Sequence, residues 1–190
     1  MQLDALTATV LAAPARLRGS RLVCIDGRAG AGKTVLAADL ADACSAAGPV
    51  TTIHMDDLYD GWSGLPTAAD VVIDQLIEHW TAGGPASLAI WDWHAQRRLP
   101  PVPVALTPVV LLEGVGSWSL RYRDRVSTLT WVECDEPTRR RRAIDRDGNA
   151  LAAHWDAWAA DEEVVHARER TRAMADLVVD TGAQRSASLP

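Results

Sequence analysis

The stretch Gly27-Arg28-Ala29-Gly30-Ala31-Gly32-Lys33-Thr34 decides the fold. It follows the apolar run 22–26 and precedes a helix-like segment that begins at residue 35. A glycine, four residues and then Gly-Lys-Thr form the P-loop pattern, and a strand before it and a helix after it make the pattern meaningful. The glycines let the backbone curl so that successive N–H groups point at phosphate oxygens, and the helix adds the positive end of its dipole. The sequence therefore predicts that residues 27–34 cradle the phosphates of a nucleotide.

Lys33 and Thr34 have separate predicted roles in this cradle. The ammonium of Lys33 would reach the β- and γ-phosphates, and the hydroxyl of Thr34 would bind Mg²⁺. Lys33 is also the single lysine among nineteen basic residues, so a compact ammonium stands only where phosphates are expected. A glycine-rich turn without function is the alternative. A dinucleotide-binding fingerprint fits worse, because the glycines do not fall as Gly-x-Gly-x-x-Gly.

Length and composition limit the class of protein. A chain of 190 residues with 48% hydrophobic content is expected to form one α/β domain. The net charge of −6 argues against nucleic-acid binding through a general basic surface. Cys24, Cys44 and Cys134 show no zinc spacing and indicate reduced thiols in a cytoplasm. The N-terminal residues contain no long apolar run, so neither a signal peptide nor a membrane anchor is expected. The oligomeric state stays open, with a homodimer as one option.

Hydrophobic periodicity predicts a three-layer fold with a mostly parallel, five-stranded sheet and helices on both faces. The expected core strands are 21–26, 50–54, 109–114, 129–134 and 177–180. The expected helices are 2–17, 33–47, 68–80, one that follows Pro137, and 150–175 with a break. A strand at 88–94 opens a substrate hairpin at about 87–104, and a lid is expected at about 136–150. The single domain would thus span 1–180, and the tail 181–190, which lacks an apolar pattern, is predicted to be disordered.

Three acidic residues follow two of the predicted strands. Asp56 and Asp57 come directly after strand 50–54, and functional residues collect at the carboxyl ends of parallel strands. An aspartate there can hold a metal-bound water or accept a proton from a substrate hydroxyl, although the pair could also be a solvated turn or helix cap. Glu113 ends the apolar run at 109–114 and is expected to hold Mg²⁺ directly or through water. A purely structural glutamate there would need a partner that the sequence does not show.

An arginine run lies on the helix that follows Pro137. Arg139, Arg142 and Arg146 fall at i, i+3 and i+7, which places their guanidinium groups on one face. Beside a P-loop, these groups are expected to close over the transferring phosphates. The alternative is a solvated ion-pair face, since Asp145 and Asp147 lie nearby.

Together these residues resemble the uridine kinase branch of the P-loop small-molecule kinases, which is more distantly related to phosphoribulokinase and pantothenate kinase. The segment 54–59 is similar to the family's Ser-x-Asp-Ser-Phe-Tyr, which implies that Asp56 is catalytic and that Tyr59 contacts the acceptor base. Trp91-Asp92-Trp93 resembles Tyr-Asp-Phe of the substrate hairpin and implies that Trp91 lines the base pocket, although Trp91 and Trp93 could be packing aromatics. Leu112-Glu113-Gly114 matches Phe-Glu-Gly, and 138–147 resembles the lid.

The chain also departs from that family. Gln96 stands where uridine kinases place a histidine in the hairpin, and Arg28-Ala29-Gly30-Ala31 replaces the usual serines of the P-loop. The C-terminal part is shorter. Phosphoryl transfer is therefore better supported than uridine as the substrate.

The resulting hypothesis is an enzyme that transfers the γ-phosphoryl group of ATP to a hydroxyl of a small molecule, most simply a nucleoside. Mg²⁺ would be bound by Thr34, Asp56 and Glu113, and the acceptor by Asp56, Tyr59, Trp91 and Gln96. Other acceptors, namely a vitamin precursor, a sugar or a nucleoside monophosphate, remain alternatives, as does a non-catalytic ATP-binding regulatory module. A Ras-type guanine switch is excluded, because its Asn-Lys-x-Asp segment needs a second lysine.

Overall fold

A computed structural model describes residues 2–182, the side chains of residues 2, 149 and 150 excepted. Its centre is a five-stranded sheet in the order β2-β7-β1-β8-β9, in which every neighbouring pair is parallel. The strands are β1 (Arg21–Asp26), β2 (Val50–His54), β7 (Val109–Glu113), β8 (Val126–Glu133) and β9 (Leu177–Asp180). The predicted α/β class with a five-stranded sheet is confirmed, and the sheet is parallel throughout.

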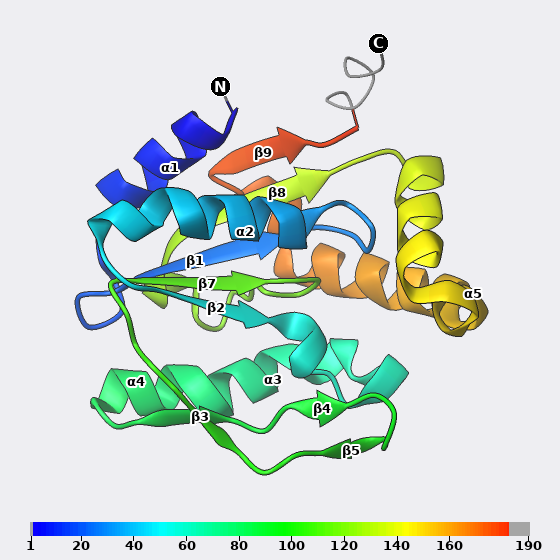
Figure 1. The fold of residues 1–190 in the computed structure, drawn as a ribbon, viewed down its shortest axis with the longest axis horizontal. Coiled ribbons are helices and arrows are strands. Elements are labelled where there is room, and N and C mark those ends of the chain that lie inside the picture. Colours follow the sequence, from blue (N-terminus) through cyan, green and yellow to red (C-terminus); the bar gives the residue numbers. More distant parts are fainter. Residues whose placement is uncertain (1, 183–190) are drawn as a thin grey trace.

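Alternating side chains of the strands supply two apolar faces. Val23 and Ile25 pack with α1 (Gln2–Ala12) and α2 (Lys33–Cys44), whereas Leu22 and Cys24 belong to the core on the opposite face. Figure 1 shows α1 and α2 on one side of the sheet, with α3 and α4 on the other side and α5 passing behind. Both faces are thus covered, as a parallel sheet requires. All carboxyl ends point the same way, toward the loop that joins β1 to α2.

Two predicted helices differ in length from the structure. The first ends at Ala12 rather than Leu17, because Pro14 lacks an amide hydrogen and disfavours helical backbone in the residue before it. The helix predicted at 68–80 continues to Ala82 through α3 (Ala68–Val72), the π-helical η5 (Ile73–Ile77) and α4 (Glu78–Ala82). Single 3₁₀ turns occupy Ser45–Ala47, Met55–Asp57, Gly61–Ser63, Leu65–Thr67 and Arg123–Arg125.

The predicted hairpin consists of two short antiparallel pairs. β3 (Ala86–Leu88) pairs with β6 (Val102–Val104), and β4 (Trp91–Asp92) pairs with β5 (Arg97–Arg98). The single strand predicted at 88–94 is interrupted at Ala89, whose backbone groups are bonded to side chains instead of a strand. Its N–H donates to Gln75 Oε1 at 2.8 Å, and its carbonyl accepts from Arg98 Nη1 at 2.6 Å.

The C-terminal third is a kinked helix followed by the last strand. Helix α5 (Glu136–Glu169) is capped by Asp135 and bends at Gly148, where φ is 68° and ψ is −151°. The predicted arginine helix and the predicted helix at 150–175 are its two halves, and α6 (Thr171–Met174) follows. Of the tail predicted to be disordered, residues 183–190 lie outside the described residues. Thr181 is held, since its N–H donates to the Glu133 carbonyl at 3.0 Å and its hydroxyl to the Ala31 carbonyl at 2.6 Å. Within residues 2–182, no helix is both long and apolar enough to cross a membrane.

Candidate phosphate and acceptor site

The P-loop is a tightly packed backbone turn between β1 and α2. A Cβ on Gly27 would lie 2.2 Å from the Val132 carbonyl oxygen, and one on Gly30 would lie 2.1 Å from the Arg139 carbonyl oxygen. Only glycine fits at these two positions, where φ is also positive. Lys33 begins α2 and is buried inside the loop, with its Nζ donating to the carbonyls of Gly27 at 2.8 Å and Arg28 at 3.0 Å. The packing of the fold therefore shapes the phosphate cradle and positions the Lys33 ammonium inside it.

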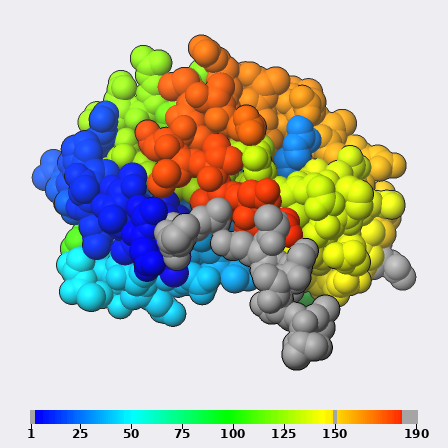
Figure 2. Space-filling view, turned by 90° about the horizontal axis from the view of Figure 1, so that it is seen from above, coloured from blue at the N-terminus to red at the C-terminus, as the bar shows by residue number. Residues whose placement is uncertain are grey.

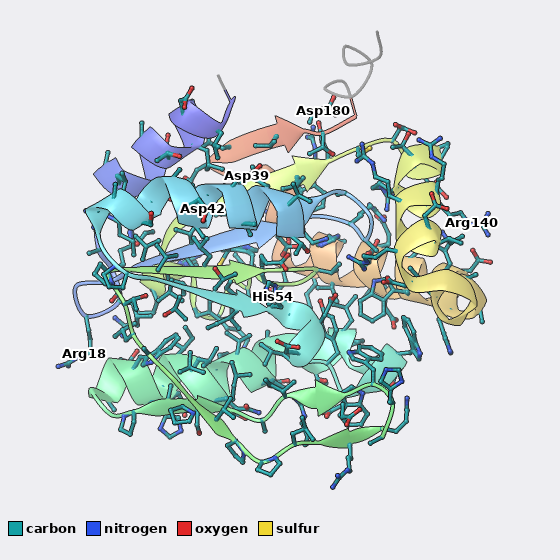
Figure 3. The ribbon with its side chains drawn as sticks, in the orientation of Figure 1. Arg18, Asp39, Asp42, His54, Arg140 and Asp180 are labelled. Atoms are coloured by element: carbon teal, nitrogen blue, oxygen red, sulfur yellow. The ribbon has the colours of Figure 1, made fainter. Side chains whose placement is uncertain are left out.

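Glu113 lies beside this cradle at the end of β7. The strand register places Glu113 next to Ile25 of β1 and His54 of β2, and its side chain is buried. Its Oε1 accepts a hydrogen bond from the Thr34 hydroxyl at 3.1 Å and contacts His54 Nδ1 at 2.6 Å. Figure 3 shows His54 at the end of β2. His54 is the partner of Glu113 that the sequence did not reveal.

The donor atoms at this point fit a bound cation. Glu113 Oε2 is buried and has no hydrogen-bond partner in the part of the chain that the structure describes. No group of three or more His, Cys, Asp or Glu side chains suited to a metal occurs among those residues. Thr34 and Glu113 thus offer two oxygen ligands, and phosphate oxygens and water would complete the shell that Mg²⁺ prefers.

Asp56 and Asp57 have different surroundings. Asp56 lies at the mouth of the site, and desolvation by the surrounding protein raises its pKa. The charges of Lys33 and Arg146 lower this pKa, and the charge of Glu113 raises it further. Burial also raises the pKa of Asp57, whereas the charge of His54 lowers it and that of Glu113 raises it. Asp56 is therefore the aspartate that shares the electrostatic field of the P-loop lysine and the arginine helix.

The three arginines predicted to form the lid have three different partners. Arg139 is buried and donates to the Ala29 carbonyl of the P-loop at 3.0 Å. Arg142 donates to the hydroxyl and the carbonyl of Thr181, at 3.2 Å each. Arg146 is bonded to Asp147, and its pKa is raised by that bond and by the charges of Asp56 and Glu113. The charge of Arg146 thus acts on Asp56, at the acceptor side of the site.

An aromatic cluster, Trp62, Trp93, His154 and Trp158, lies on that side. The Trp62 ring stacks on His154 with centroids 4.6 Å apart, and lies 4.9 Å from Trp93 and 6.1 Å from Trp158. The Trp93 indole N–H donates to the Asp56 carbonyl at 3.0 Å, which fixes the hairpin beside the aspartate. The turn after β2, the hairpin and the second half of α5 thus meet next to Asp56.

The remaining predicted acceptor residues have three different environments. Tyr59 is 1% exposed, and its hydroxyl donates to the Val115 carbonyl at 2.7 Å, so it supports the core and makes no surface for a base. Trp91 is half-buried under the Arg98 guanidinium, and its indole N–H has no partner among residues 2–182. Gln96 lies at the exposed hairpin tip with its side-chain amide bonded to the Trp93 carbonyl. The structure therefore corrects the expected contact of Tyr59.

Two buried carboxylates that sequence reasoning missed hold the P-loop in place. Asp26 accepts from the N–H groups of Gly27, Gly116 and Trp118, at 2.7, 3.0 and 3.1 Å, and from His166 Nε2. Glu162 on α5 accepts from the Ala29 N–H at 2.6 Å. The position of Asp26 at the end of an apolar run was a visible signal, whereas nothing in the sequence links residue 162 to the P-loop.

Glu162 also connects the two sides of the site. The same Oε1 that accepts from the P-loop accepts from the Trp158 indole at 3.0 Å, and the Glu162 side chain is 1% exposed. Trp158 in turn packs edge-on against Tyr59 and Trp62. One carboxylate is therefore shared between the phosphate cradle and the aromatic cluster.

Comparison with known proteins gives a fold. No family model and no curated protein sequence matches the chain. Among solved structures, a possible uridine kinase from Bacillus stearothermophilus is similar, with a TM-score of 0.66 and 22% identity over 94% of this chain and 97% of that one. A provisionally named fructose transport system kinase from Silicibacter sp. TM1040 is similar at the same TM-score and identity, over 94% and 98%. The chain shares the fold of these two proteins over almost its whole length.

Proposed function

We propose that the chain is a P-loop kinase that transfers the γ-phosphoryl group of ATP to a hydroxyl of a small molecule, with a nucleoside as the leading acceptor. The observation that carries this proposal is the convergence of Lys33, Thr34, Glu113 and Asp56 at one edge of the sheet. Thr34 and Glu113 are in direct contact although they are 79 residues apart in the sequence. Phosphate ligands, cation ligands and an acid–base group therefore stand side by side.

Each residue has a role that its position supports. Lys33 and the P-loop N–H groups hold the β- and γ-phosphates, and Thr34 and Glu113 hold Mg²⁺. When bound, Mg²⁺ neutralises negative charge on the phosphates. The acceptor oxygen forms a bond to the γ-phosphorus as the bond to the β,γ-bridging oxygen breaks, and Asp56 accepts the hydroxyl proton. The positive charge of Arg146 acts on Asp56 and Glu113 and stabilises the developing charge.

The aromatic cluster favours an acceptor with a planar ring. Trp62 and Trp93 lie next to Asp56, the proposed general base, and aromatic faces bind flat rings by stacking. A nucleoside combines such a ring with a primary hydroxyl. A sugar remains the second candidate, since one structural neighbour is named as a fructose transport system kinase, and its ring could also pack on an indole face.

An acceptor screen tests the proposal. ADP release from MgATP would be measured with nucleosides, sugars, alcohols related to vitamins and nucleoside monophosphates, each compared with the rate without acceptor. We expect a nucleoside to raise the rate and Asp56→Asn to remove that increase. MgATP binding without stimulation by any acceptor would instead support the regulatory module. Absence of MgATP binding would contradict both functions.

A further inference from the structure

A second hollow, of about 510 Å³, lies behind the P-loop. It is enclosed by the carboxyl end of β8, both halves of α5 and α6, and none of Lys33, Thr34, Asp56 or Glu113 lines it. Figure 2 shows the blue surface of the P-loop region in the recess between the yellow-green and orange halves of α5. The volume falls in the range of small-molecule sites. The hollow is thus separate from the proposed Mg²⁺ and acceptor positions.

Positive charge exceeds negative charge around this hollow. Four arginines line it, against two glutamates, in a chain whose net charge is −6. Both glutamates are already paired, Glu163 with Arg28 and Glu133 with Arg172. The four lining arginines are Arg28, Arg139, Arg170 and Arg172.

Within the part of the chain that the structure describes, two of those guanidinium groups have no carboxylate partner. There the Arg139 side chain donates hydrogen bonds only to the backbone carbonyls of Cys134 and Ala29. The Arg170 side chain forms no hydrogen bond or ion pair with any residue from 2 to 182. Guanidinium groups that lack a carboxylate and share a concave surface are suited to a bound anion.

An indole ring and an imidazole ring form part of the inner wall of the hollow. Trp131 and His166 line the hollow, are 6% and 8% exposed, and pack edge to face with centroids 4.8 Å apart. His166 Nε2 is bonded to Asp26, whereas His166 Nδ1 and Trp131 Nε1 have no partner among the described residues. Both nitrogen atoms have almost no accessible surface, so they lie within the wall, and the arginines are the polar groups of the hollow that remain for a ligand.

We propose that this arginine-lined hollow binds a small phosphate monoester as a second ligand. The planar guanidinium forks match phosphate oxygens, and the Trp131 ring supplies an apolar wall for the organic part of the ligand. Arg28 makes the hollow adjacent to the phosphate cradle, because it belongs to the P-loop and lines the hollow as well. The site is additional to the kinase reaction and does not depend on the identity of its acceptor.

Calorimetry with phenyl phosphate and inorganic phosphate tests the proposal. The full chain is first saturated with MgADP, so that the P-loop is filled. We expect binding of one phenyl phosphate per chain, weakened about tenfold by Arg170→Gln and by Arg172→Gln, the scale of a lost charge-assisted bond. Arg125→Gln removes the same charge from an exposed position outside the hollow and should leave the affinity unchanged. If MgADP itself does not bind, that result counts against the proposed function, and the arginine variants are then compared on the free chain.

Indole resonances locate the bound ligand. In a ¹H–¹⁵N spectrum, Trp131→Phe identifies the Trp131 N–H signal, which should shift to saturation with phenyl phosphate. Three results would overturn the proposal. These are no binding to the folded protein, an affinity in both arginine variants equal to that of the unsubstituted protein, or binding of succinate as tight as that of phenyl phosphate, which would replace phosphate specificity with general anion binding. If Trp131→Phe does not fold, the affinities of the arginine variants decide the matter alone.

Discussion

The two sides of the site are built in different ways. The phosphate side consists of eight consecutive residues whose shape is set by backbone packing, as the close approaches at Gly27 and Gly30 show. The acceptor side is assembled from the turn after β2, the hairpin and the second half of α5, and its parts meet through the side chains of the aromatic cluster. A contiguous backbone motif tolerates little change, whereas an assembled surface can vary its ligand. Substitutions on the phosphate side and on the acceptor side should therefore affect activity in different ways.

The largest effect is expected at Lys33 on the phosphate side. Lys33→Ala should lower kcat/KM by about 10³-fold, because it removes the charge that faces the phosphates and also the two bonds to the P-loop carbonyls. Lys33→Arg should fail as well, since a planar fork does not fit where a buried ammonium lies. Steady-state kinetics measures kcat/KM, and circular dichroism checks that each variant is folded. Full activity in the arginine variant would show that the cradle is not matched to an ammonium.

Asp56 gives the next largest effect and tests the acceptor side. Asp56→Asn should lower kcat by about 10²-fold and change MgATP affinity less. Asp57→Asn is the matched control, and its loss should be smaller. A larger loss of kcat in Asp57→Asn than in Asp56→Asn would identify Asp57, and not Asp56, as the general base.

The pH dependence of the same enzyme gives a separate check on Asp56. Its pKa is raised, so the ionised form that accepts a proton is lost at a higher pH than for an ordinary aspartate. Activity should therefore rise with pH through that raised pKa and level off above it. Asp56→Asn should flatten this acidic limb of the profile, whereas Asp57→Asn should retain it. A limb that persists in Asp56→Asn belongs to another group.

The same contrast explains what could be predicted from the sequence. The P-loop, Glu113 and Asp56 were found because each follows a strand within a few residues and the parallel sheet brings strand ends together. Tyr59 was misplaced because a resemblance fixes its position along the chain but not its direction, and its hydroxyl turns inward to Val115. The break in the strand at Ala89 depends on Gln75 and Arg98, which are distant in sequence and carry no local signal. Contacts made by α5 beyond the Gly148 kink were hidden for the same reason.

Glu162 joins the two sides, and its substitution should have an intermediate effect. Glu162→Ala leaves the Ala29 N–H and the Trp158 indole without their acceptor, so we expect MgATP binding to weaken about tenfold, as for a lost bond to a charged group. Glu162→Gln keeps an acceptor oxygen and should restore most of the affinity. Glu163→Ala is the control, because that side chain is 68% exposed and pairs with Arg28 on the outside of the P-loop. Equal losses in Glu162→Ala and Glu163→Ala would mean that the charge of Arg28, and not the bond to the P-loop, is what matters.

The smallest effects are expected in the arginine run, where the structure divides residues that the sequence grouped together. Arg146→Ala should lower kcat by about tenfold with little change in MgATP affinity, because the charge of Arg146 is felt at Asp56 and acts on charge that develops in the transition state. Arg139→Ala should weaken MgATP binding and lower the melting temperature, since Arg139 is buried and holds the Ala29 carbonyl.

Arg140 is exposed and points away from the fold in Figure 3, and Arg141 is exposed too. Alanine at either should change stability and the activation free energy by no more than about 0.5 kcal/mol. Kinetics on these four variants would be measured with MgATP and acceptor varied separately. We expect a change in kcat at Arg146, a change in MgATP affinity at Arg139, and no effect at Arg140 or Arg141. Equal and small losses at all four would reduce the run to a solvated surface, and the acceptor side would then contain no arginine that acts on the reaction.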